Sequence, residues 1–454
     1  MYFLYSIALT LLFLALLPYF LYQAARHGKY LASFWQRLGR LPSDAASDGR
    51  PTIWLHAVSV GEFNAARPLV STLKREMSDY RIVVSTTTLS GQKLAQTLLP
   101  SECDAVFYFP FDWSFAARKA LTQVRPEVVI LMETELWPNF LRQCRKKGIS
   151  TVLANARLSS RSVRGYSLVR GFISRAIGDI SLFIAQSEGD AERARLLGAR
   201  HSSIRVCGNT KYDLPIESAD STNVPEDAAL WLGRGGVSEL IVAGSTAAGE
   251  EDVLLNALRL VRQKPGLQFT RLAIAPRRPE RFDEVARLVS EFGFKLARRS
   301  QSLHARDAAP GQDTDKSAVA EVLLLDSIGE LAAAYKAASV VFVGGSLVPR
   351  GGHNIIEAAV HSKPIIVGAH TYNFRQIVSD FTSGDALVQV STNNPQELAD
   401  HFARLLTDSV HASALGNRAR AILEKNRGAT ECTVAAISQL LREARRDSGR
   451  SDDR

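Results

Sequence analysis

Carboxylates and a lysine stand directly after strand-like segments in the first half of the chain, where side chains can do acid–base chemistry. Glu62 lies between an apolar strand-like segment and a helical pattern, and the dipole of that helix favours the ionised carboxylate that a general base needs. Glu133 and Glu135 follow the apolar run VVILM. Lys211 follows a third strand-like segment, where its ammonium can meet a phosphate or a developing negative charge. Each also fits a structural role: Glu62 in an ordinary first helical turn, Glu133 in a salt bridge and Lys211 in a solvated turn.

Glycine-rich turns in the second half predict a site for an anionic ligand. The segments 242–252 and 343–359 follow strand-like runs and open helices, so their backbone N–H groups can face a phosphate. Neither contains a Walker loop or a GxGxxG fingerprint. Asn354 and Glu357 stand three residues apart and share one helix face, where the carboxylate can accept both hydroxyls of a ribose. Arg277 adds a bidentate ligand for phosphate or carboxylate.

The sequence contains no pattern typical of a metal site or of a catalytic nucleophile. The four cysteines are scattered, with no CxxC pair and no Cys/His cluster. No spaced set of His, Asp and Glu and no nucleophile elbow is present. We therefore expect no metal site and no cofactor, and we expect the cysteines to be reduced thiols in a cytosolic compartment. His56, inside an apolar segment, is expected to be a core residue.

Short β-branched segments alternate with helical patterns from residue 51 onward, which is typical of parallel sheets covered by helices on both faces. The chain has 454 residues, enough for two such domains. The predicted strands cover 52–59, 81–88, 105–110, 127–133, 150–156, 181–187, 204–209, 240–246, 271–276, 321–327, 340–346, 364–369 and 386–390. Each half is thus expected to be a Rossmann-like α/β domain, with the carboxyl ends of both sheets at a shared central cleft.

The N-terminus predicts a membrane helix. Residues 1–25 carry no charged side chain and are long enough to span a bilayer. Basic residues are concentrated in residues 26–40, and the positive-inside bias places the rest of the chain in the cytoplasm. A cleavable signal peptide would carry its charges before the apolar run, so we expect an uncleaved single-pass anchor. The stretch around Trp35 fits an interfacial amphipathic helix and a plain linker helix equally well.

The formal net charge of +9 is compatible with nucleic acid, but no aromatic-interleaved basic motif or recognition helix is present. An anionic membrane or an anionic substrate explains the charge more economically. We therefore expect no nucleic-acid partner.

Six ordered segments resemble those of the Kdo transferases, the 3-deoxy-D-manno-octulosonic acid transferases of lipopolysaccharide synthesis. They are HAVSVGE, LMETELWPNF, ANARLS, GNTKYD, APRRPERF and GGSLVPRGGHNIIEAA, and the resemblance covers nearly the whole chain. It implies a two-domain GT-B glycosyltransferase that uses CMP-Kdo as donor and a lipid A precursor, lipid IVA, as acceptor at the cell inner membrane. The transfer would be a single displacement that inverts the anomeric centre.

The resemblance also implies roles for single residues. Glu62 takes the position of the general base, and Glu133 and Lys211 take positions that stabilise the transition state. The implied CMP contacts fall on Pro276, Arg277, Ile328, Gly329, Glu330, Asn354, Ile355, Ile356 and Glu357.

Two departures from the family pattern concern selectivity. The family usually reads PRHPERF and GGHNPLEPA, whereas this chain has Arg278 in place of the histidine and has Ile355, Ile356 and Ala358 around the conserved Asn and Glu. Two alternatives stay open: another GT-B enzyme with a UDP-sugar donor, and a non-catalytic membrane-bound nucleotide-sugar sensor. A dinucleotide-dependent oxidoreductase fits less well, because its phosphate fingerprint is missing.

These observations divide the chain into six expected segments. They are a transmembrane anchor (1–25), a basic juxtamembrane linker (26–50), an acceptor-binding Rossmann-like domain (51–212), an interdomain linker (213–238), a CMP-sugar-binding Rossmann-like domain (239–425), and a C-terminal helix with a charged tail (426–454).

Overall fold

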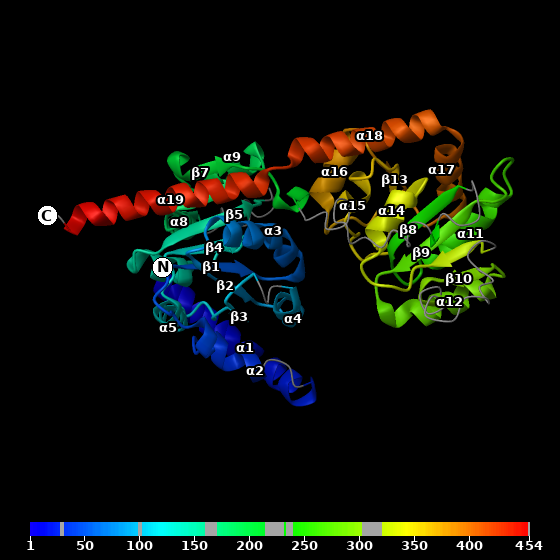
Figure 1. The fold of residues 1–454 in the computed structure, drawn as a ribbon. Coiled ribbons are helices and arrows are strands. Elements are labelled where there is room, and N and C mark those ends of the chain that lie inside the picture. Colours follow the sequence, from blue (N-terminus) through cyan, green and yellow to red (C-terminus); the bar gives the residue numbers. More distant parts are fainter. Residues whose placement is uncertain are drawn as a thin grey trace, which may run out of the picture. The chain divides into compact units, whose positions relative to one another are not determined.

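The computed structural model describes residues 1–27, 31–98, 102–158, 170–213, 231–232, 239–301 and 320–452. The chain forms two compact units, Met1–Pro215 with Asn426–Arg454, and Ile216–Lys425. Each unit contains one parallel sheet with helices packed against it, which confirms the prediction of two Rossmann-like α/β domains (Figure 1). Nearly all of the predicted linker 213–238 lies outside the described residues.

The first unit is built on a seven-stranded sheet in the order β3-β2-β1-β4-β5-β6-β7. Its strands are β1 (Thr52–Ala57), β2 (Arg81–Thr86), β3 (Ala105–Tyr108), β4 (Val128–Met132), β5 (Ser150–Ala156), β6 (Leu182–Ala185) and β7 (Ile204–Val206). All seven lie within predicted segments, and all pairs between neighbours are parallel. The strand order reverses between β1 and β4, and open α/β folds bind ligands at the carboxyl ends of strands beside such a switch point.

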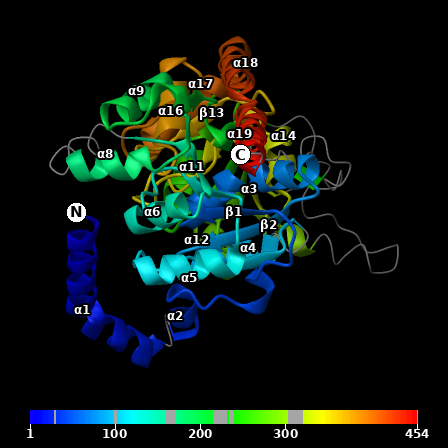
Figure 2. The same cartoon turned by 90° about the vertical axis from the view of Figure 1, so that its left-hand side faces the viewer.

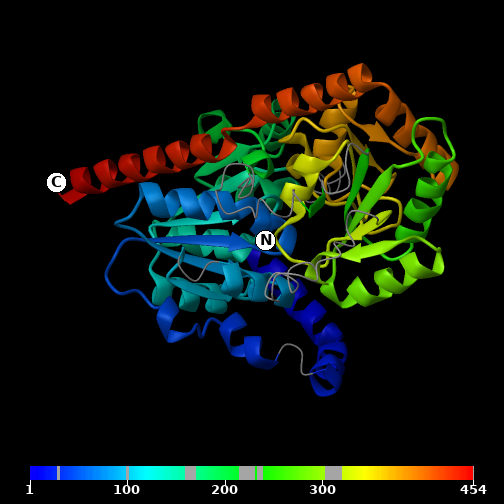
Figure 3. The same cartoon turned by 45° about the vertical axis from the view of Figure 1, so that its right-hand side comes forward.

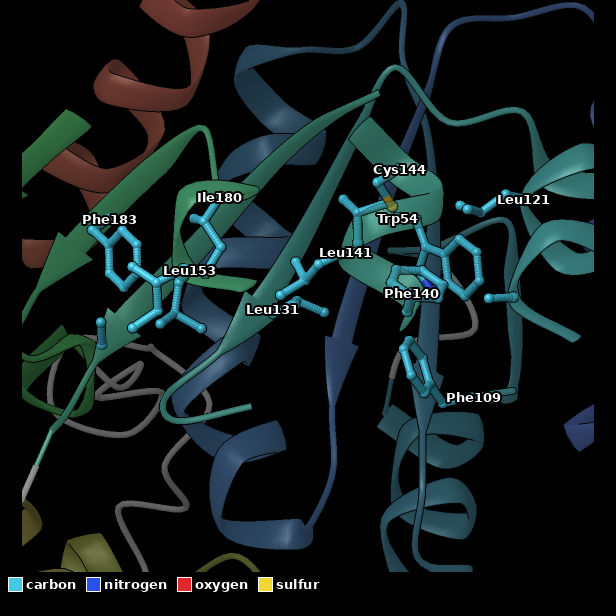
Figure 4. Close-up of a cluster of buried hydrophobic side chains, with 14 of the residues drawn as sticks. Trp54, Phe109, Leu121, Leu131, Phe140, Leu141, Cys144, Leu153, Ile180 and Phe183 are labelled. Carbon is cyan, nitrogen blue, oxygen red and sulfur yellow. The ribbon is translucent and has the colours of Figure 1, made fainter. Parts of the chain in front are cut away.

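Both faces of this sheet are buried, as expected for parallel strands whose successive side chains point to opposite sides. One face is covered by α5 (Ser114–Val124), α6 (Pro138–Lys146), α8 (Arg170–Gly178) and α9 (Glu188–Leu196). The other is covered by α3 (Val60–Glu76), α4 (Leu89–Leu98) and α19 (Ala429–Asp452). Figure 4 shows the first of these cores, where Trp54 of β1 packs edge-on against Phe140 with ring centroids 5.2 Å apart. The buried Trp54 indole donates to Ser85 Oγ at 2.7 Å, so its polar atom is satisfied.

The helix at the N-terminus, α1 (Tyr2–His27), belongs to the first unit and contacts α6 there; both are labelled in Figure 2. Tyr2 donates to Asp179 at 2.8 Å and Tyr5 donates to Asp112 at 2.9 Å. Within the described part of the chain, no helix has both the length and the apolar composition needed to cross a membrane. The predicted segment 1–25 does form a helix, and two tyrosines near its start bond to the folded unit. The short α2 (Leu31–Arg37) follows, and it contains Trp35.

The last helix, α19, returns to the first unit and packs against α3 (Figure 1). Its first turn is held by Asp213, whose carboxylate oxygens accept from the backbone N–H groups of Gly428 at 2.8 Å and Thr430 at 2.6 Å. Cys207 and Cys432 form a disulfide there, whereas Cys103 and Cys144 are free. The prediction of four reduced thiols is thus wrong for one pair. These two cysteines are 225 residues apart in sequence, and only the return of α19 brings them together.

The second unit has its own seven-stranded parallel sheet, in the order β10-β11-β9-β8-β12-β13-β14. Its strands are β8 (Leu240–Thr246), β9 (Arg271–Pro276), β10 (Leu296–Arg298), β11 (Val322–Leu324), β12 (Val340–Val343), β13 (Ile365–Val367) and β14 (Val388–Gln389). Six were predicted, and the short β10 was missed. One face packs against α11 (Glu251–Arg262), α12 (Phe282–Glu291) and α17 (Pro395–Thr407), and α11 and α12 are green in Figure 3. The unit also contains α14 (Leu331–Ala337), α15 (Ile356–Ala359), α16 (Arg375–Ser383) and α18 (Ser409–Asn426).

Candidate active site

Glu62 lies in the first turn of α3, just beyond the carboxyl end of β1. Ser59 is the N-cap of this helix and accepts weakly from the Glu62 N–H at 3.5 Å, while Glu62 Oε2 accepts from the Val58 N–H at 2.6 Å. Glu62 therefore does help to cap its helix. No other described residue bonds to its second carboxylate oxygen, Oε1, so one oxygen can accept a proton from a ligand.

Glu133 and Lys211 form an ion pair on the other side of the switch point. Glu133 directly follows β4, and its Oε1 lies 2.7 Å from Lys211 Nζ, with each side chain only 15% exposed. Lys211 belongs to a 3₁₀ turn, Thr210–Asp213, that follows β7. The backbone of Glu133 has a φ of 57°, in the left-handed region that costs a non-glycine residue about 1 kcal/mol. Strain of this kind is often found at functional sites.

Hydrogen bonds tie the lysine turn to its neighbours. The Thr210 hydroxyl donates to the Ala65 carbonyl of α3 at 2.9 Å, and the Thr210 N–H donates to Asn155 Oδ1 at 3.1 Å. Lys211 donates its own N–H to Asn209 Oδ1 at 3.0 Å. The helix that carries Glu62 and the turn that carries Lys211 are thus directly bonded to one another.

Burial and like charges strongly affect the acidity of two carboxylates in this site. Burial is the main cause that raises the pKa of Glu62 to about 8; the Val58 N–H opposes it, Glu135 and Glu133 add to it, and Lys211 lowers it. Burial also raises the pKa of Glu135 to about 7, with a further contribution from the Glu133 charge. Such values lie near neutral pH, as in many groups that exchange protons in catalysis. They leave Glu62 mostly protonated at pH 7, so the expectation that the helix dipole keeps this carboxylate ionised is corrected: burial outweighs the dipole. The structure therefore brings the sequence-predicted Glu62, Glu133 and Lys211 together, with Glu135 beside them.

The prediction that His56 is a core residue is confirmed. His56 is fully buried in β1, its Nδ1 lies 3.0 Å from both Ser85 O and Ser85 Oγ, and burial lowers its pKa to about 3. Among the described residues, no group of three His, Cys, Asp or Glu side chains is placed to hold a metal ion.

In the second unit, the predicted nucleotide contacts lie at the carboxyl edge of the sheet. Pro276 ends β9, and the Arg277 N–H donates to the Thr246 carbonyl of β8 at 3.0 Å. Asn354 Nδ2 donates to Glu357 Oε1 at 3.2 Å, and Asn354 Oδ1 accepts from the Ile356 N–H at 3.1 Å. Burial raises the pKa of Glu357, whereas the Asn354 amide and the Arg277 charge lower it. Arg277, Asn354 and Glu357 therefore form one electrostatic group, although Asn354 precedes the helix α15 rather than lying within it.

Ile355 and Ile356 are buried beside this group and act as packing residues. They anchor the start of α15 in the unit. Side-chain contacts with a ligand are thus expected from Asn354 and Glu357 rather than from these isoleucines.

The predicted segment 328–330 contains two different kinds of residue. Ile328 is 83% exposed, and Gly329 has a φ of 89° that favours glycine. Glu330, in contrast, is buried and receives three bonds from Arg299: its Nε donates to both carboxylate oxygens, at 3.0 and 3.3 Å, and its Nη2 donates to Oε1 at 2.8 Å. Since its carboxylate is engaged, we expect any contact of Glu330 with a nucleotide to come from the backbone.

The glycine-rich turns of the second unit correct one sequence interpretation. Their backbone N–H groups were expected to face a phosphate, but the fully buried Glu250 takes four of them. Its carboxylate accepts from Ala247 at 2.8 Å, Gly345 at 2.7 Å, Ser346 at 2.9 Å and Leu347 at 2.8 Å. Glu250 thus fixes the loop after β12 to the loop after β8, and a ligand must find other donors.

Sequence reasoning missed this framework. Glu250 and its neighbour Glu251 were not singled out, and Glu251 is also fully buried, bonded to Thr246 at 2.7 Å and to Arg281 at 2.7 Å. The signal was two adjacent acids at the start of a helix whose face is otherwise apolar. Asn155 was quoted within ANARLS but received no role.

Comparisons with known proteins agree with this architecture. Residues 32–214 match the family model described as 3-Deoxy-D-manno-octulosonic-acid transferase (kdotransferase), and residues 315–422 match Glycosyl transferases group 1. The chain is 34% identical to a 3-deoxy-D-manno-octulosonic acid transferase of Haemophilus influenzae over 86% of this chain and 87% of the relative. It is 31% identical to a protein of the same description from Bordetella pertussis, over 89% and 91%. A solved glycosyltransferase structure from Rickettsia africae has the same fold, with 11% identity, a TM-score of 0.54, and 87% and 99% of the two chains covered.

Proposed function

Because the chain belongs to the family of 3-deoxy-D-manno-octulosonic acid (Kdo) transferases, we propose that it transfers Kdo from CMP-Kdo to the lipid A precursor lipid IVA. The chain is a glycosyltransferase of lipopolysaccharide biosynthesis. The observation that carries the finer proposal is the group formed by Glu62, Glu133, Glu135 and Lys211 beside the switch point of the first sheet.

Glu62 is proposed to be the general base. Its Oε1 takes the proton of an acceptor hydroxyl while that oxygen forms a bond to the anomeric carbon of Kdo. The bond from this carbon to the CMP phosphate oxygen breaks, and CMP leaves with the bonding electrons from the opposite face. A single displacement of this kind inverts the anomeric centre. Oε2 meanwhile keeps its bond to the Val58 N–H, which orients the carboxylate.

Lys211 and Glu133 are proposed to act on charge. The Lys211 ammonium can stabilise negative charge on the donor carboxylate or on the departing oxygen, because it is held in a partly dehydrated site. Its ion pair with Glu133 keeps it in place before the substrates arrive. The nearby positive charge also favours the ionised form of Glu62.

The second unit is proposed to hold the CMP part of the donor. Arg277 offers a bidentate donor to the single phosphate, and the buried Glu357 with Asn354 offers acceptors and donors to the ribose hydroxyls. The exposed Ile328 can cover the base. A UDP-sugar would place a second phosphate in the same site, which makes the two donors distinguishable by competition.

Because the proposed acceptor is a membrane lipid, we propose that the enzyme works at the cell inner membrane with both units on the cytoplasmic side. The support is the exposed apolar surface of α1, which includes Phe3, Leu4, Ile7, Leu11, Leu12, Leu14 and Leu16. A helix that is bonded to the folded unit on one side and apolar on the other can enter the boundary layer of a bilayer. Co-sedimentation with anionic vesicles tests this location, and full-length protein that stays in the supernatant would contradict it.

The activity is tested by incubating the purified full chain with CMP-Kdo and lipid IVA and counting the added sugars by mass spectrometry. We expect Kdo–lipid products and release of CMP, and CMP should compete with the donor better than UDP does. Glu62→Gln is expected to lower transfer by about a hundredfold or more while CMP still binds. Glu192→Gln, on the exposed surface of α9, is the matched control and should transfer normally. A sensor would release no CMP, and a Glu62→Gln variant with near wild-type turnover would refute the role of Glu62.

A further inference from the structure

Asn155 stands out in the first unit because it is fully buried and adopts an unusual backbone conformation. It lies in β5, next to β4, and its φ of 52° falls in the left-handed region. The pairing of β5 with β6 shifts its register between Leu153 and Ala156, so Asn155 sits at an irregularity of the sheet. Asparagine tolerates this conformation better than most residues, but glycine tolerates it best. The presence of a side chain here therefore calls for a reason.

The contacts of Asn155 connect the two members of the proposed catalytic ion pair. Its Oδ1 accepts from the Thr210 N–H at 3.1 Å, and Thr210 is the residue directly before Lys211. The preceding residue, Ala154, accepts the Glu133 N–H through its carbonyl at 2.9 Å. Two successive residues of β5 therefore hold the turn that carries Lys211 and the backbone of Glu133.

The amide nitrogen of Asn155, Nδ2, lacks the hydrogen bond that its oxygen has. Its Nδ2 is buried and has no hydrogen-bond partner within the described part of the chain. An unpaired buried donor lowers stability, as does the left-handed backbone. A residue selected for stability alone would not combine both features, whereas a residue selected to hold a neighbouring turn in one place can.

We propose that Asn155 is a positioning residue for Kdo transfer, which fixes Lys211 against Glu133 by holding the N–H of Thr210. The proposal rests on the proposed roles of Glu62 and Lys211. Asn155 itself is not proposed to touch the reacting atoms. Without its Oδ1, the turn Thr210–Asp213 keeps its bond to Ala65 but loses the bond next to the lysine.

The informative variant is Asn155→Gly, because glycine adopts the same backbone without strain. We expect its Tm to stay within about 2 °C of the wild type. We expect kcat to fall by about tenfold or more, since small displacements of catalytic groups have large effects on rate, while KM for CMP-Kdo changes by less than about twofold. Gln186→Ala is the matched control, because Gln186 Nε2 donates to the Asn155 backbone carbonyl at 3.0 Å, whereas the Thr210 N–H is held by the Asn155 side-chain amide. Its kcat should remain within about twofold of the wild type.

Two readouts separate positioning from a general structural role. Lys211 favours the ionised form of Glu62, against Glu133 and Glu135, which oppose it. A displaced Lys211 should therefore move the midpoint of the pH–rate profile of Asn155→Gly to higher pH. In a double-mutant cycle, Asn155→Gly should have little further effect in a Lys211→Ala background, because it acts through the lysine.

Several results would overturn the inference. One is an Asn155→Gly variant with wild-type kcat, and another is a loss of kcat with an unchanged midpoint of the pH–rate profile. A third is that Asn155→Gly lowers kcat by the same factor in the wild type and in the Lys211→Ala background. The positioning role is also excluded if Asn155→Gly and Gln186→Ala lose Tm and kcat to the same extent. If the wild type forms no Kdo–lipid product, the proposed function fails. If Glu62→Gln and Lys211→Ala keep full activity, the proposed roles of these two residues fail. If they lose activity and Asn155→Gly does not, only the positioning role fails.

Discussion

Replacing Glu135 by glutamine is expected to move the pH dependence of Kdo transfer toward lower pH. Burial, followed by the charges of Glu135 and Glu133, raises the pKa of Glu62 to about 8. Burial raises the pKa of Glu135 itself to about 7, so Glu135 is charged over much of the range in which Glu62 titrates. Removing that charge leaves burial and Glu133 in place but relieves one repulsion on the ionised base.

The size of the effect follows from the ionised fraction of Glu62. With a pKa of about 8, about one-tenth of Glu62 is ionised at pH 7 and about nine-tenths at pH 9, so the rate should rise about tenfold between them. If glutamine lowers that pKa by about half a unit, the ratio of the two rates falls to about four. The ratio is informative because it does not depend on any uniform loss of activity in the variant.

The assay is kcat/KM for CMP-Kdo between pH 6 and 9.5 at fixed ionic strength, with lipid IVA in the same detergent throughout. Wild type and Glu135→Gln see the same substrates, so ionisation of the donor or of the lipid phosphates cancels in the comparison. Glu192→Gln should keep the wild-type ratio, because its carboxylate lies on the exposed surface of α9. A wild-type profile that is flat across this range would refute Glu62 as the titrating base. An unchanged ratio of about ten in Glu135→Gln would refute the electrostatic coupling of Glu135 to Glu62.

Three further outcomes concern stability and can be read by thermal or denaturant unfolding. Glu62→Gln should raise Tm more at pH 8 than at pH 6, because a carboxylate whose pKa is raised from 4.5 to about 8 in the fold loses stability as pH rises through that window. Glu250→Gln should lower the free energy of unfolding of the second unit by about 3 kcal/mol and weaken CMP binding, since an amide NH₂ group cannot accept the backbone N–H groups that the carboxylate holds. Reduction should lower Tm of the wild type but not of a Cys207→Ser/Cys432→Ser variant. A disulfide between residues 225 apart lowers the entropy of the unfolded chain and so adds about 5 kcal/mol to the free energy of unfolding. Equal sensitivity of both proteins to reduction would contradict the disulfide.

Much of the fold could be predicted from the sequence because buried parallel strands are continuous apolar runs. Thirteen of the strands lie within predicted segments. The exception, β10 (Leu296–Arg298), is a three-residue edge strand that ends in Arg298 and is followed by Arg299. The N-terminal helix was predicted as a helix, but its tyrosines look apolar in a hydropathy pattern and become hydrogen-bond donors only when their partners, Asp112 and Asp179, are in place.

The candidate site could be predicted only in part. The residues Glu62, Glu133 and Lys211 were singled out because each follows a strand, and parallel strands end at one edge. Their roles in the site were predicted only from the family resemblance. The pairing of Cys207 with Cys432 and the bond from Asn155 to Thr210 depend on segments that are distant in sequence. Nothing in the local pattern encodes those distances, so they could not be predicted.

Buried acids of the two units differ in how many donors they receive, and this difference separates structural from chemical roles. Glu250 accepts four backbone N–H groups, and Glu330 receives a bidentate arginine. Both are saturated, and a ligand would have to break existing bonds to use them. Glu62 accepts only one hydrogen bond among the described residues. Its pKa is raised because burial destabilises the ionised carboxylate more than this one bond stabilises it. In sequence, GSTAAGE and HAVSVGE look alike, since each places a glutamate beyond a strand at the start of a helix. The two glutamates are distinguished by the number of hydrogen-bond donors around each carboxylate. Glu62, with one donor, keeps an oxygen that can accept a proton, whereas Glu250, with four, does not.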